Sequence, residues 1–245
     1  MGNHSRYAVI SDVHANGEAL RAVLGDIRQR RIESIFFLGD AVGYGPEPNE
    51  SVGLLESECE IMIAGNHDRG AIGLADTRTF NEFARAALQW TDTVLTAYNR
   101  EVLLLAPMKA EIKELDITLV HSSPYEPERW HYILKLADAE TNFRYMHTAA
   151  CFVGHSHRPF IIEMPYSGEL NINKAVMQKR EGSRYIINAG SIGQPRDGDP
   201  RACYVIVDDD RIEIVRVSYD IALTQKKMSE NDLPLPLIER LSYGL

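Results

Sequence analysis

Histidine, aspartate and asparagine residues recur at the ends of short apolar runs in the first two thirds of this chain. The set contains two carboxylates, one amide and five imidazoles, with no thiolate. Nitrogen and oxygen donors of this kind suit manganese, iron, zinc or nickel better than soft ions. The residue types therefore point to a metal centre. The residues are Asp12, His14, Asp40, Asn66, His67, His121, His155 and His157.

Two of these pairs, Asp12 with His14 and His155 with His157, are separated by a single residue. On an extended segment two such side chains point the same way, so each pair is expected to serve one ion or two adjacent ions. The alternative for any one histidine is an ordinary hydrogen-bonded polar group. Five of the eight histidines lie at expected strand ends beside Gly, Asp or Asn, which favours the metal interpretation. For the other three, His4, His131 and His147, we expect no functional role.

The elements before these residues have the order of parallel crossover units. Residues 7–11, 34–38 and 60–64 are apolar runs typical of strands, and residues 16–30 have the 3.6-residue apolar period of a helix. A second helix is expected to begin at Pro48, which suits a first turn. In a parallel sheet the carboxyl ends of the strands lie along one edge and form the ligand crevice. Polar residues far apart in the sequence are therefore expected to meet there.

The rest of the chain predicts one long helical region followed by antiparallel strands. We expect helices over residues 79–101, 138–147, 221–229 and 236–241. We expect strands over residues 111–114, 117–121, 150–153, 159–164, 184–187, 202–207 and 211–217, with a turn at 208–210, where Asp residues favour a hairpin. No repeat or linker divides the sequence, so a single domain over residues 1–245 is expected.

Composition narrows the classes of protein. The formal net charge of -9 argues against broad binding to nucleic acid, which depends on neutralising phosphates with Lys and Arg. Three cysteines without a CxxC pair are expected to be buried, reduced thiols. No apolar stretch approaches the ~20 residues of a membrane span, and we identify no signal peptide. A cytoplasmic protein is expected.

The motifs, taken in order, resemble those of the calcineurin-like metallophosphoesterases. They are Asp12-Val-His14, Gly39-Asp40, Gly65-Asn66-His67-Asp68, His121 and Gly154-His155-Ser156-His157. The segment from Asn188 to Arg196 resembles the small bacterial and archaeal phosphodiesterase branch of that family. The resemblance implies an α/β fold, a four-layer α/β/β/α sandwich of two mixed β-sheets with helices on the outer faces.

The resemblance also implies two divalent transition-metal ions, manganese as the first choice and iron, zinc or nickel as alternatives. One ion would be held by Asp12, His14, Asp40 and His157, and the other by Asp40, Asn66, His121 and His155. A hydroxide shared by the ions would attack phosphorus in line. His67 would be the catalytic residue that assists the leaving group, without binding a metal.

A charge count weakly favours phosphodiesters over phosphomonoesters. Two divalent ions (+4), the carboxylates Asp12 and Asp40 (-2) and one hydroxide (-1) leave +1, which a diester monoanion neutralises. Asn16, Arg69 and Arg196 are candidate substrate contacts. The alternative for Asn16 is the N-cap of the first helix, and the alternative for each arginine is a surface ion pair.

Other readings of the same residues stay open. Asp68 either orients His67 or caps the turn that follows it, and Tyr44 either stacks on substrate or packs. The aromatic residues Trp130, Tyr132, Phe143 and Tyr145 either line a lid or join the core. The leading function is a hydrolase acting on a small phosphate ester, with no membrane or nucleic-acid partner. The alternatives are a binding scaffold that has lost catalysis and a nuclease.

Overall fold

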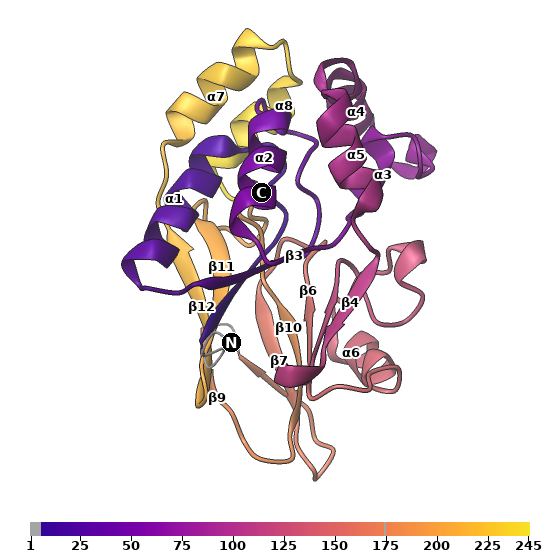
Figure 1. Cartoon of the computed structure of the whole chain (residues 1–245), viewed down its shortest axis with the longest axis vertical. Coiled ribbons are helices and arrows are strands. Elements are labelled where there is room, and N and C mark those ends of the chain that lie inside the picture. The colour runs from indigo at the N-terminus through magenta and orange to yellow at the C-terminus, as the bar shows by residue number, and fades with distance from the viewer. Residues whose placement is uncertain (1–5, 174) are drawn as a thin grey trace.

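Two mixed six-stranded sheets form the centre of the computed structural model, which describes residues 6–173 and 175–245 (Figure 1). His4 lies outside the described residues. The first sheet has the order β3 (Ile61–Met62), β2 (Ser34–Phe37), β1 (Tyr7–Ile10), β11 (Ala202–Val207), β12 (Arg211–Val217), β9 (Val176–Gln178). The second has the order β4 (Lys109–Ile112), β5 (Ile117–Val120), β6 (Ala150–Val153), β10 (Arg184–Asn188), β7 (Phe160–Met164), β8 (Asn171–Asn173).

Each sheet has a parallel part with antiparallel strands beside it. Strands β1, β2 and β3 are parallel, and β11, β12 and β9 continue that sheet in antiparallel fashion. In the second sheet β5, β6 and β10 are parallel, while β4, β7 and β8 pair antiparallel. The parallel strands bring their carboxyl ends to a common edge, as expected from the sequence.

The two sheets and the helices outside them form four layers, and a cluster of apolar side chains lies between each pair of neighbouring layers. Val9, Phe36 and Val205 of the first sheet pack against Phe152 and Ile187 of the second. Helices α1 (Gly17–Gln29) and α2 (Pro48–Glu58) cover the outer face of the first sheet through a cluster that includes Leu20, Val52, Phe37 and Tyr204. Helix α6 (Leu136–Phe143) covers the second sheet with Phe143 against Ile162 and Ile186. The predicted four-layer α/β/β/α sandwich is confirmed.

The remaining helices lie mostly in the upper half of the view in Figure 1, beyond the strands. They are α3 (Asn66–Ala71), α4 (Glu82–Val94), α5 (Ala97–Leu105), α7 (Ile221–Glu230), α8 (Leu235–Glu239) and the single turns η1 (Thr77–Thr79), η2 (Lys113–Leu115), η3 (Pro127–Arg129) and η4 (Arg240–Ser242).

The expected helix over residues 79–101 is wrong in one respect, because it is two helices. Leu95 and Thr96 are extended between α4 and α5. Thr96 caps α5 by accepting a hydrogen bond from the Asn99 N–H, and its own N–H donates to Asn49 in α2. A cap and a contact from a distant helix thus replace the continuous helical bonds. Strands β8 and β9 were also missed; both are three residues long and lie at sheet edges.

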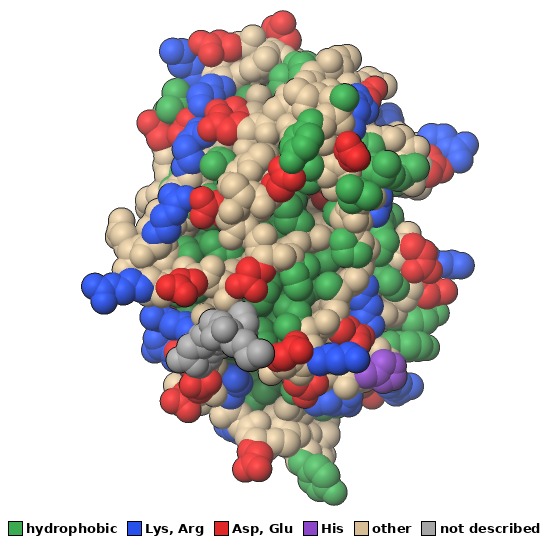
Figure 2. Space-filling view, viewed as in Figure 1, with side chains coloured by type: hydrophobic (Ala, Val, Ile, Leu, Met, Phe, Trp, Pro, Cys, Tyr) green, Lys and Arg blue, Asp and Glu red, His purple; other side chains and the backbone are tan. Residues whose placement is uncertain are grey.

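The cysteines and the charged side chains have the following positions. The three cysteines are free; Cys151 and Cys203 are buried as expected, whereas Cys59 is only partly buried. On the face drawn in Figure 2, basic and acidic side chains are interspersed and no basic band crosses it. Among the described residues, no helix has both the length and the apolar character to cross a membrane.

Candidate metal centre and active site

The seven predicted metal ligands come from both sheets and meet in one buried cluster. Asp12 and His14 follow β1, Asp40 follows β2, and Asn66 begins α3 just after β3. His121 follows β5, and His155 and His157 follow β6. All seven side chains are buried, the most exposed at 6%. Packing the two sheets face to face is therefore what brings the ligands of the first sheet to those of the second.

One half of the cluster contains Asp12, His14 and His157. The Nε2 atoms of His14 and His157 are 3.0 Å apart. Asp12 Oδ1 lies 3.2 Å from Nε2 of His157 and 3.7 Å from Nε2 of His14. The three donor atoms lie close enough together to surround one cation.

The other half contains Asp40, Asn66, His121 and His155. Nε2 of His121 lies 3.3 Å from Asp40 Oδ2 and 3.2 Å from Asn66 Oδ1. The ring of His155 packs edge-on against that of His121, with centroids 5.1 Å apart. Asp40, His121 and His155 offer donor atoms close enough to share a second cation.

Asp40 lies between the two halves. Its Oδ2 faces His121 at 3.3 Å and His14 at 3.6 Å, so one carboxylate oxygen is in reach of an imidazole from each group. Its Oδ1 accepts a hydrogen bond of 2.8 Å from the backbone N–H of His67, which fixes the carboxylate plane. Gly65 permits this approach, since a Cβ there would lie 2.0 Å from Asp40 Oδ1.

Backbone carbonyls set the tautomers of four of the histidines. Nδ1 of His14, His121 and His157 lies 3.1, 2.8 and 2.5 Å from the carbonyl oxygens of Val42, Leu38 and Gln194, respectively. His155 instead directs Nε2 to the carbonyl of Trp130, at 2.9 Å. A carbonyl only accepts, so each of these ring nitrogens carries the proton and the other nitrogen faces the cluster. Metal-binding histidines in proteins are commonly oriented in this way.

The resulting donor set fits a cation. In neutral rings the facing Nε2 atoms of His14 and His157 both present lone pairs, which repel at 3.0 Å. Asp12 Oδ1 beside them is buried and has no hydrogen-bond partner among the described residues. A buried carboxylate and two lone pairs without a donor are costly unless a positive charge lies among them. A divalent ion satisfies all three.

The pKa shifts agree with this donor set. Burial alone would raise the pKa of Asp12 and Asp40, but neighbouring imidazoles, His121 foremost for Asp40 and His157 for Asp12, hold both below the usual range. Burial lowers the pKa of His14 and brings that of His155 to about 3. Anionic carboxylates and neutral imidazoles are the forms that bind divalent ions.

His121 differs from the other ligands. Burial opposes its charge, but Asp40 and then Asp12 outweigh burial and raise its pKa to about 9. The proton on its Nε2 thus takes the position opposite Asp40 that a cation would take, and metal binding would release it.

The backbone around the ligands is unusual. Asp12, His14, Asp40, His155 and His157 all have φ between 48° and 64°, the left-handed region that non-glycine residues seldom adopt. We expected the Asp-x-His and His-x-His pairs to lie on extended segments, and that expectation was wrong. The side chains converge because the chain turns sharply after each strand. Such strain, of order 1 kcal/mol or more per residue, clusters at functional sites.

His67 lies beside both groups of ligands in an aromatic setting. Its ring centroid is 4.7 Å from that of His14, 4.5 Å from Tyr44 and 5.0 Å from Phe80. Burial lowers its pKa to about 4, although Asp40 opposes that shift. Its Nδ1 is buried without a hydrogen-bond partner among the described residues. Gly43 leaves room for this ring, because a Cβ there would lie 2.5 Å from that Nδ1.

Asp68 neither orients His67 nor caps the turn that follows it, because all four of its hydrogen-bond donors precede it in the sequence. One carboxylate oxygen accepts from the N–H groups of Asp40 and Gly65, at 2.8 and 2.9 Å. The other accepts from Ala41 and Val42, at 2.8 and 3.2 Å. The single carboxylate thus fastens the loop after β2 to the start of α3, which positions Asp40.

The three candidate substrate contacts have different surroundings. Asn16 is the N-cap of α1: its Oδ1 accepts from the Ala19 N–H, and its Nδ2 donates to the Gly193 carbonyl. The cap interpretation is confirmed, and we drop Asn16 from the substrate contacts. Arg69 donates to the carbonyls of Leu104 and Ala106 at the end of α5.

Arg196 remains directed to the site. Its guanidinium donates to the hydroxyl of Tyr44 at 3.2 Å and to Gln194 Oε1 at 2.9 Å. Its charge helps to lower the pKa of both His67 and His157, behind the larger effect of burial. The positive charge is therefore close to the residues proposed to act on the substrate.

The aromatic residues divide between core and site. Tyr44 packs on His14 and His67, and Phe143 belongs to the core beneath α6. Tyr132, 48% exposed, stacks on His155 with ring centroids 4.0 Å apart. Trp130 supplies the carbonyl for His155 and packs edge-on against His121. The segment before α6 therefore covers one side of the cluster.

Sequence reasoning missed several supporting residues. The hydroxyl of Ser191 donates to the Asp12 carbonyl, and that of Ser11 donates to Asp12 Oδ2, at 2.8 and 2.5 Å. Asn188 donates to the carbonyl of Gly154 at 2.6 Å and to Ser156 at 3.0 Å. The motif from Asn188 to Arg196 was the one available signal for Asn188 and Ser191. Ser11 gave no signal of its own.

Comparison with known proteins gives a consistent result. Residues 6–211 match the calcineurin-like phosphoesterase superfamily domain. The chain is 42% identical to the uncharacterized protein MJ0912 of Methanocaldococcus jannaschii, over 98% of both chains. It is 41% identical to the crystal structure of a metallophosphoesterase from Sphaerobacter thermophilus, with a TM-score of 0.85 over 98% of this chain and 99% of that one.

A more distant structure shares the fold over the same length. The hypothetical protein PH1004 from Pyrococcus horikoshii OT3 is 22% identical, with a TM-score of 0.79 over 98% of both chains. Residues 6–211, the stretch that matches the superfamily domain, contain every side chain of the cluster described above. This chain belongs to the calcineurin-like phosphoesterase superfamily.

Proposed function

We propose that the protein hydrolyses phosphodiesters, and more slowly phosphomonoesters, with two divalent metal ions. The observation that carries the proposal is the position of Asp40, whose Oδ2 faces His14 of one donor group and His121 of the other. A single carboxylate shared in this way suits a pair of adjacent cations. Asp12, His14, Asp40 and His157 would hold one ion, and Asp40, Asn66, His121 and His155 the other.

When bound, the two cations would supply a water of lowered pKa and positive charge to neutralise the phosphate oxygens. In hydrolysis a water oxygen forms a new bond to phosphorus, the bond from phosphorus to the leaving alcohol breaks, and that alcohol takes up a proton. The neutral imidazole of His67 would donate a hydrogen bond to the departing oxygen as its negative charge grows.

Two features of the surroundings support this role for His67. Phe80 and Tyr44 pack around its ring, and Asp40 accepts from its backbone N–H, so its position is fixed. Arg196, held by Tyr44 and Gln194, would attract the phosphate anion and offset charge on its oxygens.

Manganese is the metal we propose first. Carboxylate, amide and imidazole donors suit manganese and iron, and the cluster contains no thiolate that would select a softer ion. Zinc and nickel are the alternatives, and metal content measured after purification from unsupplemented cells would rank them.

Turnover measurements test the function. The purified protein, loaded with Mn²⁺, should release p-nitrophenol from bis-p-nitrophenyl phosphate faster than from p-nitrophenyl phosphate, and chelation should abolish both. Absence of turnover in a preparation shown to contain two ions per chain would favour a non-catalytic scaffold. Cleavage of DNA or RNA in preference to both small esters would favour a nuclease.

A further inference from the structure

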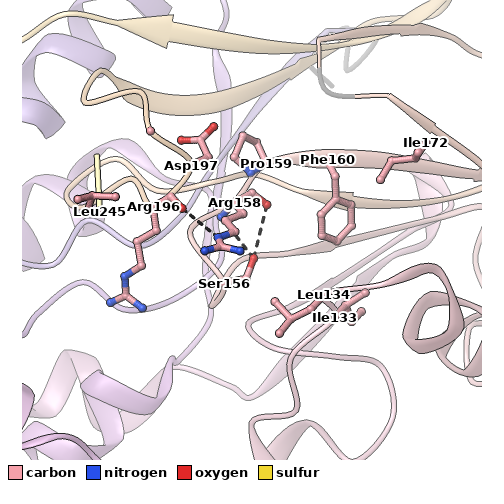
Figure 3. Close-up of a pocket in the computed structure, with 11 residues that line it drawn as sticks. Ile133, Leu134, Ser156, Arg158, Pro159, Phe160, Ile172, Arg196, Asp197 and Leu245 are labelled. Carbon is pink, nitrogen blue, oxygen red and sulfur yellow. Dashed lines mark hydrogen bonds between the residues drawn. The ribbon is translucent and has the colours of Figure 1, made fainter. Parts of the chain in front are cut away.

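Two separate clefts are lined by residues that neighbour the proposed metal centre. The first, with a volume of about 550 Å³, is lined by Ser156, Arg158, Phe160, Arg196 and Asp197, and by apolar side chains from three other segments (Figure 3). The second, of about 840 Å³, is lined by residues that include Arg69, Leu74, Phe80, Met108 and Trp130. Neither cleft is explained by metal binding.

The first cleft begins beside the histidines of the cluster. Ser156 lies between His155 and His157 in the sequence, and the backbone N–H of Arg196 donates to the carbonyl of His157 at 3.2 Å. Arg158 donates from Nε to the Arg196 carbonyl at 2.9 Å, drawn as a dashed line in Figure 3. Two arginines line the end nearest the metal site, and the carboxylate of Asp197 beside them is paired with Arg216, so this end carries net positive charge.

The rest of the first cleft is apolar although it is open to solvent. Leu134 and Ile172 are 64% and 53% exposed, and both line this cleft together with the buried Ile133. In Figure 3 Ile133 and Leu134 lie on one side of Phe160, and Ile172 on the other. Exposed apolar side chains gathered in one depression mark a binding surface.

The second cleft lies on the His67 side of the cluster. Phe80, one of its walls, packs on the His67 ring with centroids 5.0 Å apart. Trp130, another wall, packs against His121 at 5.9 Å. Leu74 is 57% exposed on its rim. A group leaving towards His67 would enter this cleft.

We infer that the two clefts hold the two organic groups of a phosphodiester, an inference that rests on the proposed function. The leaving alcohol occupies the Phe80–Trp130 cleft beside His67. The retained ester group occupies the cleft of Leu134 and Ile172, and Arg196 and Arg158 lie between that group and the phosphate. The preferred substrate is a small phosphodiester whose retained group is apolar and larger than methyl.

Two esters that share one leaving group can test the two clefts independently. Methyl and hexyl p-nitrophenyl phosphate release the same p-nitrophenol and differ only in the retained group. Each methylene that leaves water is worth about fourfold in affinity, so partial burial of the hexyl chain should raise kcat/KM about tenfold over the methyl ester. Leu134→Ser should bring this ratio towards one. Leu74→Ser, in the other cleft, should lower kcat/KM for both esters by the same factor and leave the ratio intact.

Leu105→Ser is the matched control, because Leu105 is 74% exposed on α5 and lines neither cleft. This substitution should leave kcat/KM unchanged for both esters. A wild-type ratio near one, or a ratio altered by Leu74→Ser and not by Leu134→Ser, overturns the assignment of the clefts. Failure of the wild-type, metal-loaded protein to hydrolyse either ester would instead refute the proposed function itself.

Discussion

The substitution Asp68→Asn tests how the loop that carries Asp40 is held. The carboxylate of Asp68 accepts four backbone N–H groups, two on each oxygen. An asparagine of the same shape keeps one oxygen and replaces the other with an NH₂ group that only donates. Two buried N–H groups are then left facing a donor, whichever way the amide is turned.

The cost of that change follows from the count of lost acceptors. A buried donor without a partner costs about 1–3 kcal/mol, so two cost about 2–6 kcal/mol. Each kcal/mol lowers Tm by about 2–4 °C in a protein of this size, and we expect a Tm lower by about 10 °C. Because the Asp40 N–H is one of the four donors, metal affinity should also fall by roughly 10- to 100-fold.

The assay is thermal unfolding followed by circular dichroism, together with titration of Mn²⁺. Asp209→Asn, which removes an exposed carboxylate in the turn between β11 and β12, is the control and should leave both quantities unchanged. A Tm for Asp68→Asn within about 2 °C of wild type, with normal metal affinity, would refute the reasoning that Asp68 positions the site.

Three further predictions concern residues of the proposed substrate site. His67→Ala should retain both metal ions by elemental analysis and lose activity by roughly 10²–10⁴-fold; loss of an ion would show that His67 is a ligand. Gly43→Ala should lower kcat with metal content unchanged, because the new Cβ displaces the His67 ring; full activity would contradict this packing. Arg196→Met should raise KM for phosphate esters about tenfold or more, a loss of charge-assisted contacts, and an unchanged KM would remove Arg196 from the phosphate site.

The ligand positions were predictable because each follows an apolar run that folds as a strand. Two observations were enough to place Asp12 after β1, Asp40 after β2 and His121 after β5. They are the period of the apolar residues and the rule that parallel strands end at one edge of a sheet. The four-layer arrangement did not follow from that pattern. It was expected only from the resemblance in the motifs, because the sequence of a strand does not determine which other sheet packs against it.

The missed features have two physical origins. The left-handed conformation of Asp12 and His14, and the carbonyls that orient the histidines, depend on backbone atoms that are alike for every residue type. The break between α4 and α5 depends on Asn49, which is 47 residues from Thr96 in the sequence. Contacts of that range appear only when the helices are packed together.

The most direct test of the shared carboxylate is the metal content of Asp40→Asn, compared with that of Asp12→Asn and of the wild type. Wild type should hold two ions per chain, and Asp12→Asn should lose mainly one. Asp40→Asn should weaken both sites together, since Asp40 faces His14 and His121 at once. If Asp40→Asn kept one ion at full occupancy while it lost the other, Asp40 would belong to a single site and the two-ion centre proposed here would be contradicted.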